Sequence, residues 1–493
     1  MTASAAARPK QETSPWVVLL IVSIAQFMVV LDATVTNVAL PSIQRDLHFT
    51  QSSLQWVINS YTLLFGGFLL LGGRAGDLFG RRRVFMVGVG IFSLASLFNG
   101  LATSSEMLIA GRALQGFGAA LVSPAALSIV TTSFSEGAER TKALGIWSGI
   151  AAGGGAVGLL VGGILTDALS WPWVFYVNVP VGIAALALAV RFVPESRAKR
   201  RPDSVDAAGA VSVTGGLLVL VYAIVKAQDY GWGSARTIGL SAVAVALLVA
   251  FVAIERRSKA PLIRLGIFRQ RSLTGANAVL LLVASGLFAM FFFTSIYAQE
   301  ILGYSPLKAG LAFLPVTAGI GLGAGSAQQL IRRFGVRPVA GVGMTLATVG
   351  MFLLTGIAAN GTYASDLLPG LLFVSIGMGL TFVPITLIAT TGVAAEDAGL
   401  ASGIFNTAQQ VGGALGLAVL STLAANATTN HLQGLGHKPG VADRAVGLVD
   451  GFQVAFLAGG VLMAAAVALM LVLVRPTDVE LIDLEAEAVM APA

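Results

Sequence analysis

The chain has 493 residues, of which 56% are hydrophobic and only 11% are charged, with a mean hydropathy of +0.84 and a net charge of +6. This composition lies far outside the range of soluble domains and indicates a polytopic membrane protein. The absence of cysteine excludes disulfide, iron–sulfur and thiol chemistry, and the three histidines show no metal-ligand spacing, so we expect no metal and no cofactor.

Apolar runs of about 20 residues, enough to cross ~30 Å of hydrocarbon as a helix, recur along the chain. Transmembrane β-strands would need alternating apolar and polar residues, which are absent, so we predict an all-α fold of about 14 spans. The sequence divides into a six-helix bundle (1–195), a two-helix insert with linkers (196–265), a second six-helix bundle (266–475) and a cytoplasmic tail (476–493). The spans are expected near 16–40, 54–72, 84–102, 105–128, 141–164, 173–192, 206–226, 237–255, 273–298, 307–327, 337–357, 367–391, 400–424 and 451–474.

Lysine and arginine are distributed unequally between the two sides of the membrane. An even number of spans places both termini on one side, where the loops carry 23 basic residues against 6 on the other. Because basic loops stay inside, we predict a multi-pass protein of the bacterial cytoplasmic (inner) membrane with both termini cytoplasmic and an uncleaved first helix. The positive charge then reflects topology and contact with membrane lipids, so no nucleic-acid partner is expected.

The first span carries an acidic residue near its middle, Asp32, in the string LDATVTNVALP from Leu31 to Pro41. An ionised carboxylate at mid-bilayer costs roughly 2.5 to 3.5 kcal/mol, so such a residue usually faces a protein or water-filled interior and has a function. A second charge, Arg112, lies inside the fourth span. Asp32 could take up protons, contact substrate or be a fixed hydrogen-bond acceptor. Arg112 could act as a permanent positive field or simply neutralise an acid.

Two loops in corresponding positions carry a weak internal repeat. The loop after the second span reads GRAGDLFGRRR (73–83), and the loop after the tenth reads QLIRRFGVR (329–337). When Phe79-Gly80 is aligned with Phe334-Gly335, basic residues flank both pairs. This pattern indicates two duplicated blocks, as in transporters built from repeats.

With these features the chain resembles a major facilitator superfamily (MFS) transporter, of the fourteen-span drug:proton antiporter branch, over nearly its whole length. The string from Leu31 to Pro41 is similar to the first-span signature of that branch. The segment around Arg112 is similar to the fourth-span motif of the branch. The cytoplasmic loop motif of the superfamily is matched by Gly73, Asp77, Gly80, Arg81 and Arg82.

The resemblance implies proton-coupled export of hydrophobic drugs or antibiotics by alternating access, with coupling through Asp32 and Arg112. It assigns the loop motif a conformational role, and we expect a monomer that binds small hydrophobic or amphipathic substrates, protons and membrane lipids. One alternative is a narrow-specificity exporter of a lipid, an amino acid or a self-made metabolite. A polytopic membrane enzyme is the other, but the spans show no nucleophile with a base and no buried His/Asp cluster.

The fifth span has a glycine-rich face of Gly154, Gly158, Gly162 and Gly163, similar to the antiporter motif of the branch, with Leu159 at the usual proline position. Small residues spaced by four allow helices to approach closely. We expect this face to be a helix–helix contact that bears on gating.

Polar and aromatic residues within the spans are candidates for the substrate cavity. In the ninth span the aromatic candidates fall on roughly one helix face, which could line a substrate cavity or pack against neighbouring helices. Polar candidates need hydrogen-bond partners when buried, so they could equally bond neighbouring helices, and the acid among them could simply be solvated. The set is Asn37, Gln115, Phe288, Phe292, Tyr297, Glu300, Asn406 and Gln410.

Overall fold

The computed structural model describes residues 14–134, 138–196, 206–258, 261–390 and 398–476, in which all regular structure is helical. Thirteen of the described helices, some with an adjoining short helix, are long and apolar enough to cross a membrane. One further helix of 31 residues, α6 (Ala138–Ala168), occupies the place of the predicted fifth span. The predicted all-α polytopic fold is therefore confirmed.

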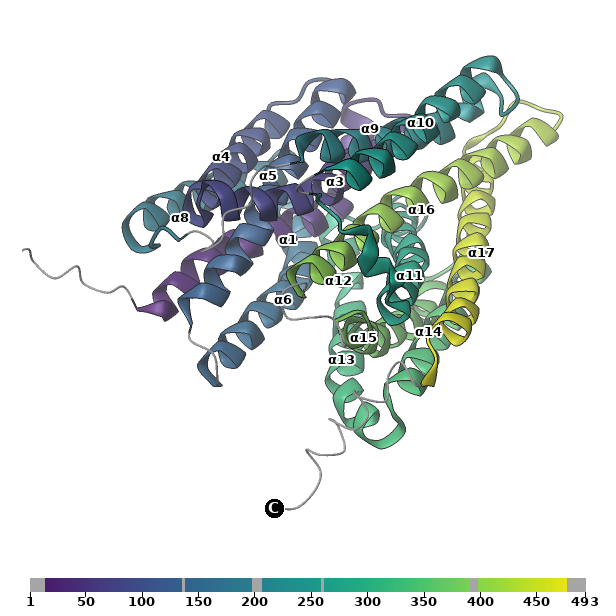
Figure 1. Ribbon diagram of the computed structural model, residues 1–493. Coiled ribbons are helices and arrows are strands. Elements are labelled where there is room, and N and C mark those ends of the chain that lie inside the picture. Colours follow the sequence, from purple (N-terminus) through teal and green to yellow (C-terminus); the bar gives the residue numbers. More distant parts are fainter. Residues whose placement is uncertain (1–13, 135–137, 197–205, 259–260, 391–397, 477–493) are drawn as a thin grey trace, which may run out of the picture.

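The first bundle is built from the N-terminal helices, coloured purple to blue in Figure 1. Its central contacts are made by α1 with α6, by α3 with α5 and by α4 with α5. The elements are α1 (Pro15–Asp46), α2 (Gln51–Leu54), α3 (Trp56–Phe79), α4 (Arg81–Gly100), α5 (Ser105–Ser133), α6, α7 (Trp173–Tyr176) and α8 (Asn178–Phe192).

The second bundle repeats the arrangement in the C-terminal half, with α14 against α15, α13 against α15, and α11 against α16 and α17. Its elements are α11 (Arg271–Ile296), a π-helical turn η2 (Tyr297–Ile301), α12 (Pro306–Ala312), α13 (Leu314–Phe334), α14 (Val336–Leu353), a 3-10 turn η3 (Leu354–Gly356), a π-helical turn η4 (Tyr363–Leu367), α15 (Leu368–Thr390), α16 (Ala398–Gly434) and α17 (Val441–Leu473). A 3-10 turn, η1 (Leu265–Arg269), precedes it.

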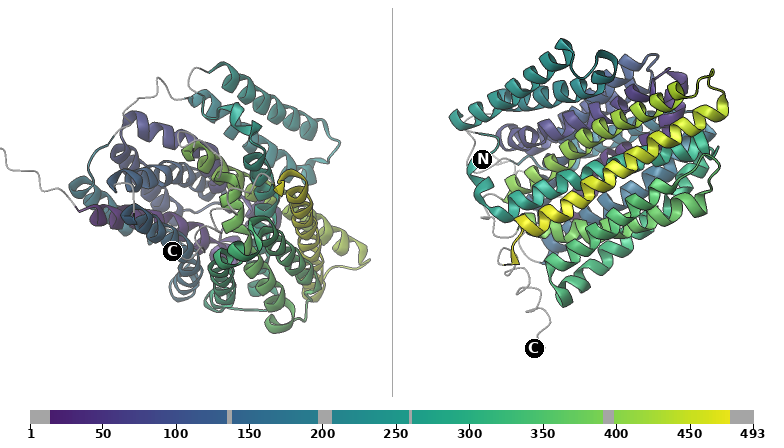
Figure 2. Two further views of the ribbon diagram at one scale, coloured as in Figure 1. Left: turned by 60° about the horizontal axis from the view of Figure 1, so that its bottom comes forward. Right: turned by 90° about the vertical axis from the view of Figure 1, so that its right-hand side faces the viewer.

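The two inserted helices, α9 (Ala207–Tyr230) and α10 (Ala235–Arg257), lie along one side of both bundles (Figures 1 and 2). α9 packs against α3 of the first bundle and α16 of the second. A small apolar core joins them, with Leu63 from α3, Val221 from α9 and Ala414 from α16. α10 packs mainly on α9, and only 11% of its most apolar stretch is buried.

The predicted domain boundaries stay a prediction, and the tail beyond residue 476 lies outside the described residues.

Contacts between the bundles lie toward the end of the molecule remote from the start of α1. Ser295 of α11 donates a hydrogen bond to the backbone oxygen of Asn37 at 2.8 Å. Gln299 of η2 donates to the backbone oxygen of Val38 at 2.9 Å. Nearer the middle of the span, the hydroxyl of Thr407 on α16 donates to the backbone oxygen of Gly66 on α3 at 3.2 Å.

The glycine face of α6 packs on α1 of the same bundle through Gly154, Gly158 and Gly162, and Gly163 faces α12 of the second bundle. A Cβ atom added to Gly162 would lie 2.8 Å from the backbone oxygen of Val35 on α1, and one added to Gly163 would lie 2.8 Å from the backbone oxygen of Pro306 on α12. From the α12 side, a Cβ on Gly310 would lie 2.6 Å from the oxygen of Leu159. Glycine is therefore required for α6 to contact α1 and α12 at backbone distance.

We predict that Gly163→Ala opens the contact between α6 and α12. The new methyl group meets backbone, which cannot move away as a side-chain tip can, so the second bundle must shift. Because the chain has no cysteine, a single reporter such as Val38→Cys, at a fully buried position of α1, can be labelled with a membrane-impermeant maleimide. Gly163→Ala should increase the labelling rate at this reporter.

The control is Gly90→Ala, since a Cβ at Gly90 meets nothing within 4 Å. Equal labelling rates in the two backgrounds would show that the contact does not hold the bundles together.

Candidate functional site

Asp32 lies fully buried on α1 with both carboxylate oxygens occupied. Its Oδ2 accepts a hydrogen bond from Nη1 of Arg112 at 2.5 Å, which is also an ion pair. Its Oδ1 accepts from the side-chain amides of Gln115 at 2.7 Å and Asn178 at 2.8 Å. Asp32 and Arg112 are 0% and 1% exposed, so the pair is shielded from solvent on all sides.

Arg112 is held by contacts to three other helices besides its own. Its Nε donates to the backbone oxygen of Val57 on α3 at 3.0 Å, and its Nη1 also donates to Oε1 of Gln115 at 2.8 Å. The guanidinium carbon lies 4.3 Å from the ring centroid of Tyr61 and 5.7 Å from that of Phe175. Aromatic faces attract a cation, and more strongly where water is excluded.

An outer layer of polar side chains completes the cluster. Ser96 accepts hydrogen bonds from Asn178 at 2.9 Å and Gln115 at 3.2 Å, and donates to the backbone oxygen of Phe175 at 2.9 Å. Asn99 donates to Oε1 of Gln115 at 2.7 Å. Sequence analysis missed Ser96, Asn99 and Asn178, although each is a polar residue within a predicted apolar run.

The cluster lies nearer the end of the bundle remote from the start of α1. Arg112 is the eighth residue of α5, which places it about 10 Å from the beginning of that helix at 1.5 Å per residue. Asn178 is the first residue of α8, and Asn99 is in the last turn of α4. Arg112 thus lies about two helical turns from the start of α5, whereas Asp32 lies near the middle of α1.

The loop motif joins α3, α4 and the end of α8. Gly80 has a φ of +107°, a backbone conformation that favours glycine, and connects α3 to α4. Asp77 pairs with Arg81 at 3.1 Å. The backbone N–H of Arg82 donates to Oε1 of Glu195 at 3.2 Å, and its guanidinium donates to the oxygen of Val193 at 3.1 Å.

Glu195, which follows the end of α8, thus caps the start of α4, a contact that sequence analysis did not identify. A Cβ on Gly80 would lie 2.6 Å from its carboxylate. A Cβ atom added to Gly73, the first residue of the motif, would lie 3.6 Å from Cβ of Pro124 on α5.

The aromatic cavity candidates on α11 and η2 differ in burial. Phe292 is 1% exposed and stacks edge-on against Phe293 within the core of the second bundle. Tyr297 is fully buried and donates to the backbone oxygen of Ala358 at 2.8 Å. Phe288 is only partly buried and lies against Gly413 of α16.

The polar cavity candidates are not brought together in one place. Gln115 belongs to the Asp32 cluster. Asn37 bonds the oxygen of Ala33 on its own helix, and Asn406 is exposed and bonds the oxygen of Ser402. Gln410 is half-buried on α16, against Gly66 of α3, and Glu300 is exposed.

In the described part of the chain no group of three or more acidic or histidine side chains is arranged to hold a metal ion.

Comparisons with known proteins agree with this arrangement. Residues 22–417 match the family described as Major Facilitator Superfamily. The puromycin resistance protein pur8 of Streptomyces alboniger is 44% identical over 456 residues, which cover 92% of this chain and 90% of that protein. The cephamycin export protein CmcT of Amycolatopsis lactamdurans is 40% identical over 432 residues, covering 87% and 88% of the two chains.

Among solved structures, the fold is similar to that of a bacterial homologue of the human lysosomal transporter Spinster in an inward-facing, unoccupied conformation. The TM-score is 0.65 at 17% sequence identity, with 94% of this chain and 96% of that chain covered.

The Asp32–Arg112 pair predicts a strong energetic coupling. Arg112→Gln leaves an unpaired carboxylate in the protein interior, which should cost about 3 to 5 kcal/mol of folding stability. Adding Asp32→Asn to Arg112→Gln removes the unpaired carboxylate charge. The double variant should therefore be more stable than the Arg112→Gln single variant. Unfolding of the purified variants in detergent, followed as a double-mutant cycle, measures this coupling.

The surface pair Lys226–Asp229, 38% and 53% exposed, is the control, and Asp229→Asn should change stability by less than about 1 kcal/mol. Additive effects of the Asp32 and Arg112 substitutions would contradict the prediction.

Proposed function

Because the chain belongs to the major facilitator superfamily, a family of transporters and not of enzymes, we propose that it exports hydrophobic or amphipathic antibiotics across the bacterial cytoplasmic membrane in exchange for protons. Two relatives, one named as a resistance protein and the other as an export protein, support both the direction of transport and the substrate class. The observation that carries proton coupling is the buried Asp32–Arg112 pair.

Asp32 is suited to coupling because proton uptake would remove the charge that holds the cluster together. Its carboxylate accepts three hydrogen bonds, from Arg112, Gln115 and Asn178, and such bonds are stronger when the acceptor is ionised. A protonated Asp32 would leave the charge of Arg112 uncompensated in the protein interior. Proton uptake therefore loosens the present arrangement of α1, α5 and α8.

We propose that both termini are cytoplasmic, as the distribution of basic loop residues predicts. The hydrogen bonds from Ser295 and Gln299 to α1 then lie toward the outside, and the conformation is closed on that side. Arg112 lies about 10 Å from the outer end of α5 at 1.5 Å per residue, so an opening at this end gives outside protons access to the pair. Proton entry disrupts the cluster, and the bundles then rearrange to release substrate outward.

The remaining candidates take two roles in this proposal. The loop motif, with Asp77, Arg81 and Arg82 tied to Glu195 and Val193, holds α3, α4 and α8 together as one moving unit on the cytoplasmic side. Phe288 and Gln410 are partly buried and Asn406 is exposed, which leaves these side chains free to contact substrate. Phe292 and Tyr297 instead support the second bundle from within.

A narrow-specificity exporter of a self-made metabolite is the second candidate. Each of the two relatives is named for a single antibiotic, puromycin or cephamycin. The two candidates share the same coupling site and differ only in how many compounds are carried.

Proteoliposome transport tests both parts of the proposal. With an imposed pH gradient, wild-type protein should accumulate at least one compound from a panel that includes puromycin, and Asp32→Asn should abolish stimulation by the gradient. One proton moved across 100 mV provides about 2.3 kcal/mol, which supports a concentration ratio approaching fiftyfold. Asp229→Asn, at an exposed helix end, is the matched control and should transport like wild type.

Undiminished gradient-driven transport by a folded Asp32→Asn protein would refute coupling through Asp32. Accumulation of one compound alone would favour the narrow exporter, and accumulation of several unrelated compounds would favour multidrug export.

A further inference from the structure

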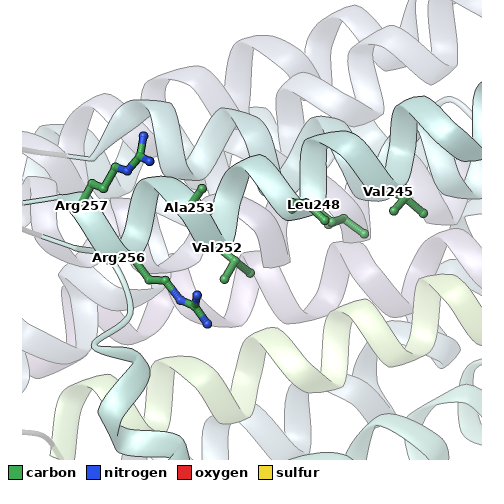
Figure 3. Close-up of a pocket in the computed structure, with 7 residues that line it drawn as sticks. Val245, Leu248, Val252, Ala253, Arg256 and Arg257 are labelled. Carbon is green, nitrogen blue, oxygen red and sulfur yellow. The ribbon is translucent and has the colours of Figure 1, made fainter.

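The outer face of α10 carries an open groove of about 510 Å³ that is separate from the contacts between the bundles (Figure 3). Its floor is apolar, from Val245 through Leu248 and Val252 to Ala253, and its end is formed by Arg256 and Arg257. Since α10 is the least buried of the described spans, this face is in contact with lipid in the membrane.

The groove is about as long as one membrane leaflet is thick. Val245, Val249, Val252 and Arg256 follow at intervals of four, three and four residues, so they share one face of the helix. The three valines are 57%, 62% and 37% exposed. At 1.5 Å per residue the stripe is about 16 Å long, close to half of the ~30 Å hydrocarbon thickness.

The two arginines at the end of the stripe have no protein counter-charge. Both are exposed, and neither makes an ion pair or a hydrogen bond within the part of the chain that the structure describes. The adjacent Glu255 faces away from the groove: it is 4% exposed, and its Oε2 accepts a hydrogen bond from the backbone N–H of Ile263 at 3.1 Å. Arg256 thus ends the valine stripe at the membrane surface, and Arg257, next to it in the chain, is directed to another side of the helix (Figure 3).

We propose that this groove binds one anionic phospholipid of the cytoplasmic leaflet, with its phosphate at Arg256, where Arg257 adds a second positive charge, and an acyl chain along Val252, Val249 and Val245. Guanidinium groups match phosphate oxygens with two parallel hydrogen bonds. The negative charge of the cytoplasmic leaflet further favours binding there. The site rests on the proposed orientation of the chain and does not depend on what is transported.

Native mass spectrometry of the full-length protein in detergent tests the site without any transport assay. Phosphatidylglycerol and phosphatidylcholine with identical acyl chains are titrated separately, and the highest-affinity binding step is compared. Wild-type protein should prefer phosphatidylglycerol, and Arg256→Gln with Arg257→Gln should weaken that step by at least about fivefold. Arg256→Lys with Arg257→Lys should retain part of the preference, because charge is kept and the paired geometry is lost.

Arg332→Gln is the matched control, since Arg332 is an exposed arginine in the last turn of α13 and lies outside the groove. Val249→Trp tests the acyl part of the site, because the indole fills the groove while both arginines remain, and it should weaken binding of both lipids. Equal binding of the two lipids by wild type would overturn the proposal. An equal loss of phosphatidylglycerol binding in Arg332→Gln would also overturn it, as would a homodimer in which a second copy of the chain covers α10 in place of lipid.

Discussion

The structure of the first bundle depends on the cost of placing a carboxylate within the membrane. An isolated buried charge is so unfavourable that it must be paired and hydrogen-bonded. Around Asp32 this requirement is met from four other helices: Arg112 and Gln115 from α5, Asn178 from α8, Ser96 from α4 behind them, and the backbone of α3 through Arg112. The positions of α3, α4, α5 and α8 around α1 are thereby fixed by one charge.

Close backbone contacts provide the second constraint. In a membrane, helices gain nothing by hiding apolar surface from lipid, so association depends on packing and on hydrogen bonds between helices. Gly162 and Gly163 are neighbours in sequence and lie about 100° apart around the helix axis, so that one faces α1 and the other faces α12. α6 can therefore contact α1 of its own bundle and α12 of the second bundle at once, and Leu159 takes part in the α12 contact through its backbone oxygen, 2.6 Å from a Cβ atom added to Gly310.

The sequence was sufficient for the helical fold and for the central charges, because a charge within an apolar run stands out against its surroundings. It could not identify Asn178, Ser96 or Glu195 as members of the two networks. Polar residues of these types are common, and only the tertiary structure brings them to Asp32 or to the start of α4. The sequence periodicity placed Phe292 and Tyr297 on a shared helix face. Periodicity does not show whether such a face lines a cavity or packs in the core of the bundle, and both side chains are in the core.

α1 is the element through which events at the buried charge can reach the contact between the bundles. Asp32 lies on it, and Thr36 bonds the Asp32 backbone oxygen at 2.8 Å one turn further on. In the same stretch, the oxygens of Asn37 and Val38 accept the hydrogen bonds from α11 and η2, and Val35 lies against Gly162 of α6. A helix transmits a displacement of one turn to the next because its backbone hydrogen bonds are continuous. In the proposed mechanism, any shift of α1 that follows protonation of Asp32 therefore moves the carbonyl groups that contact the second bundle.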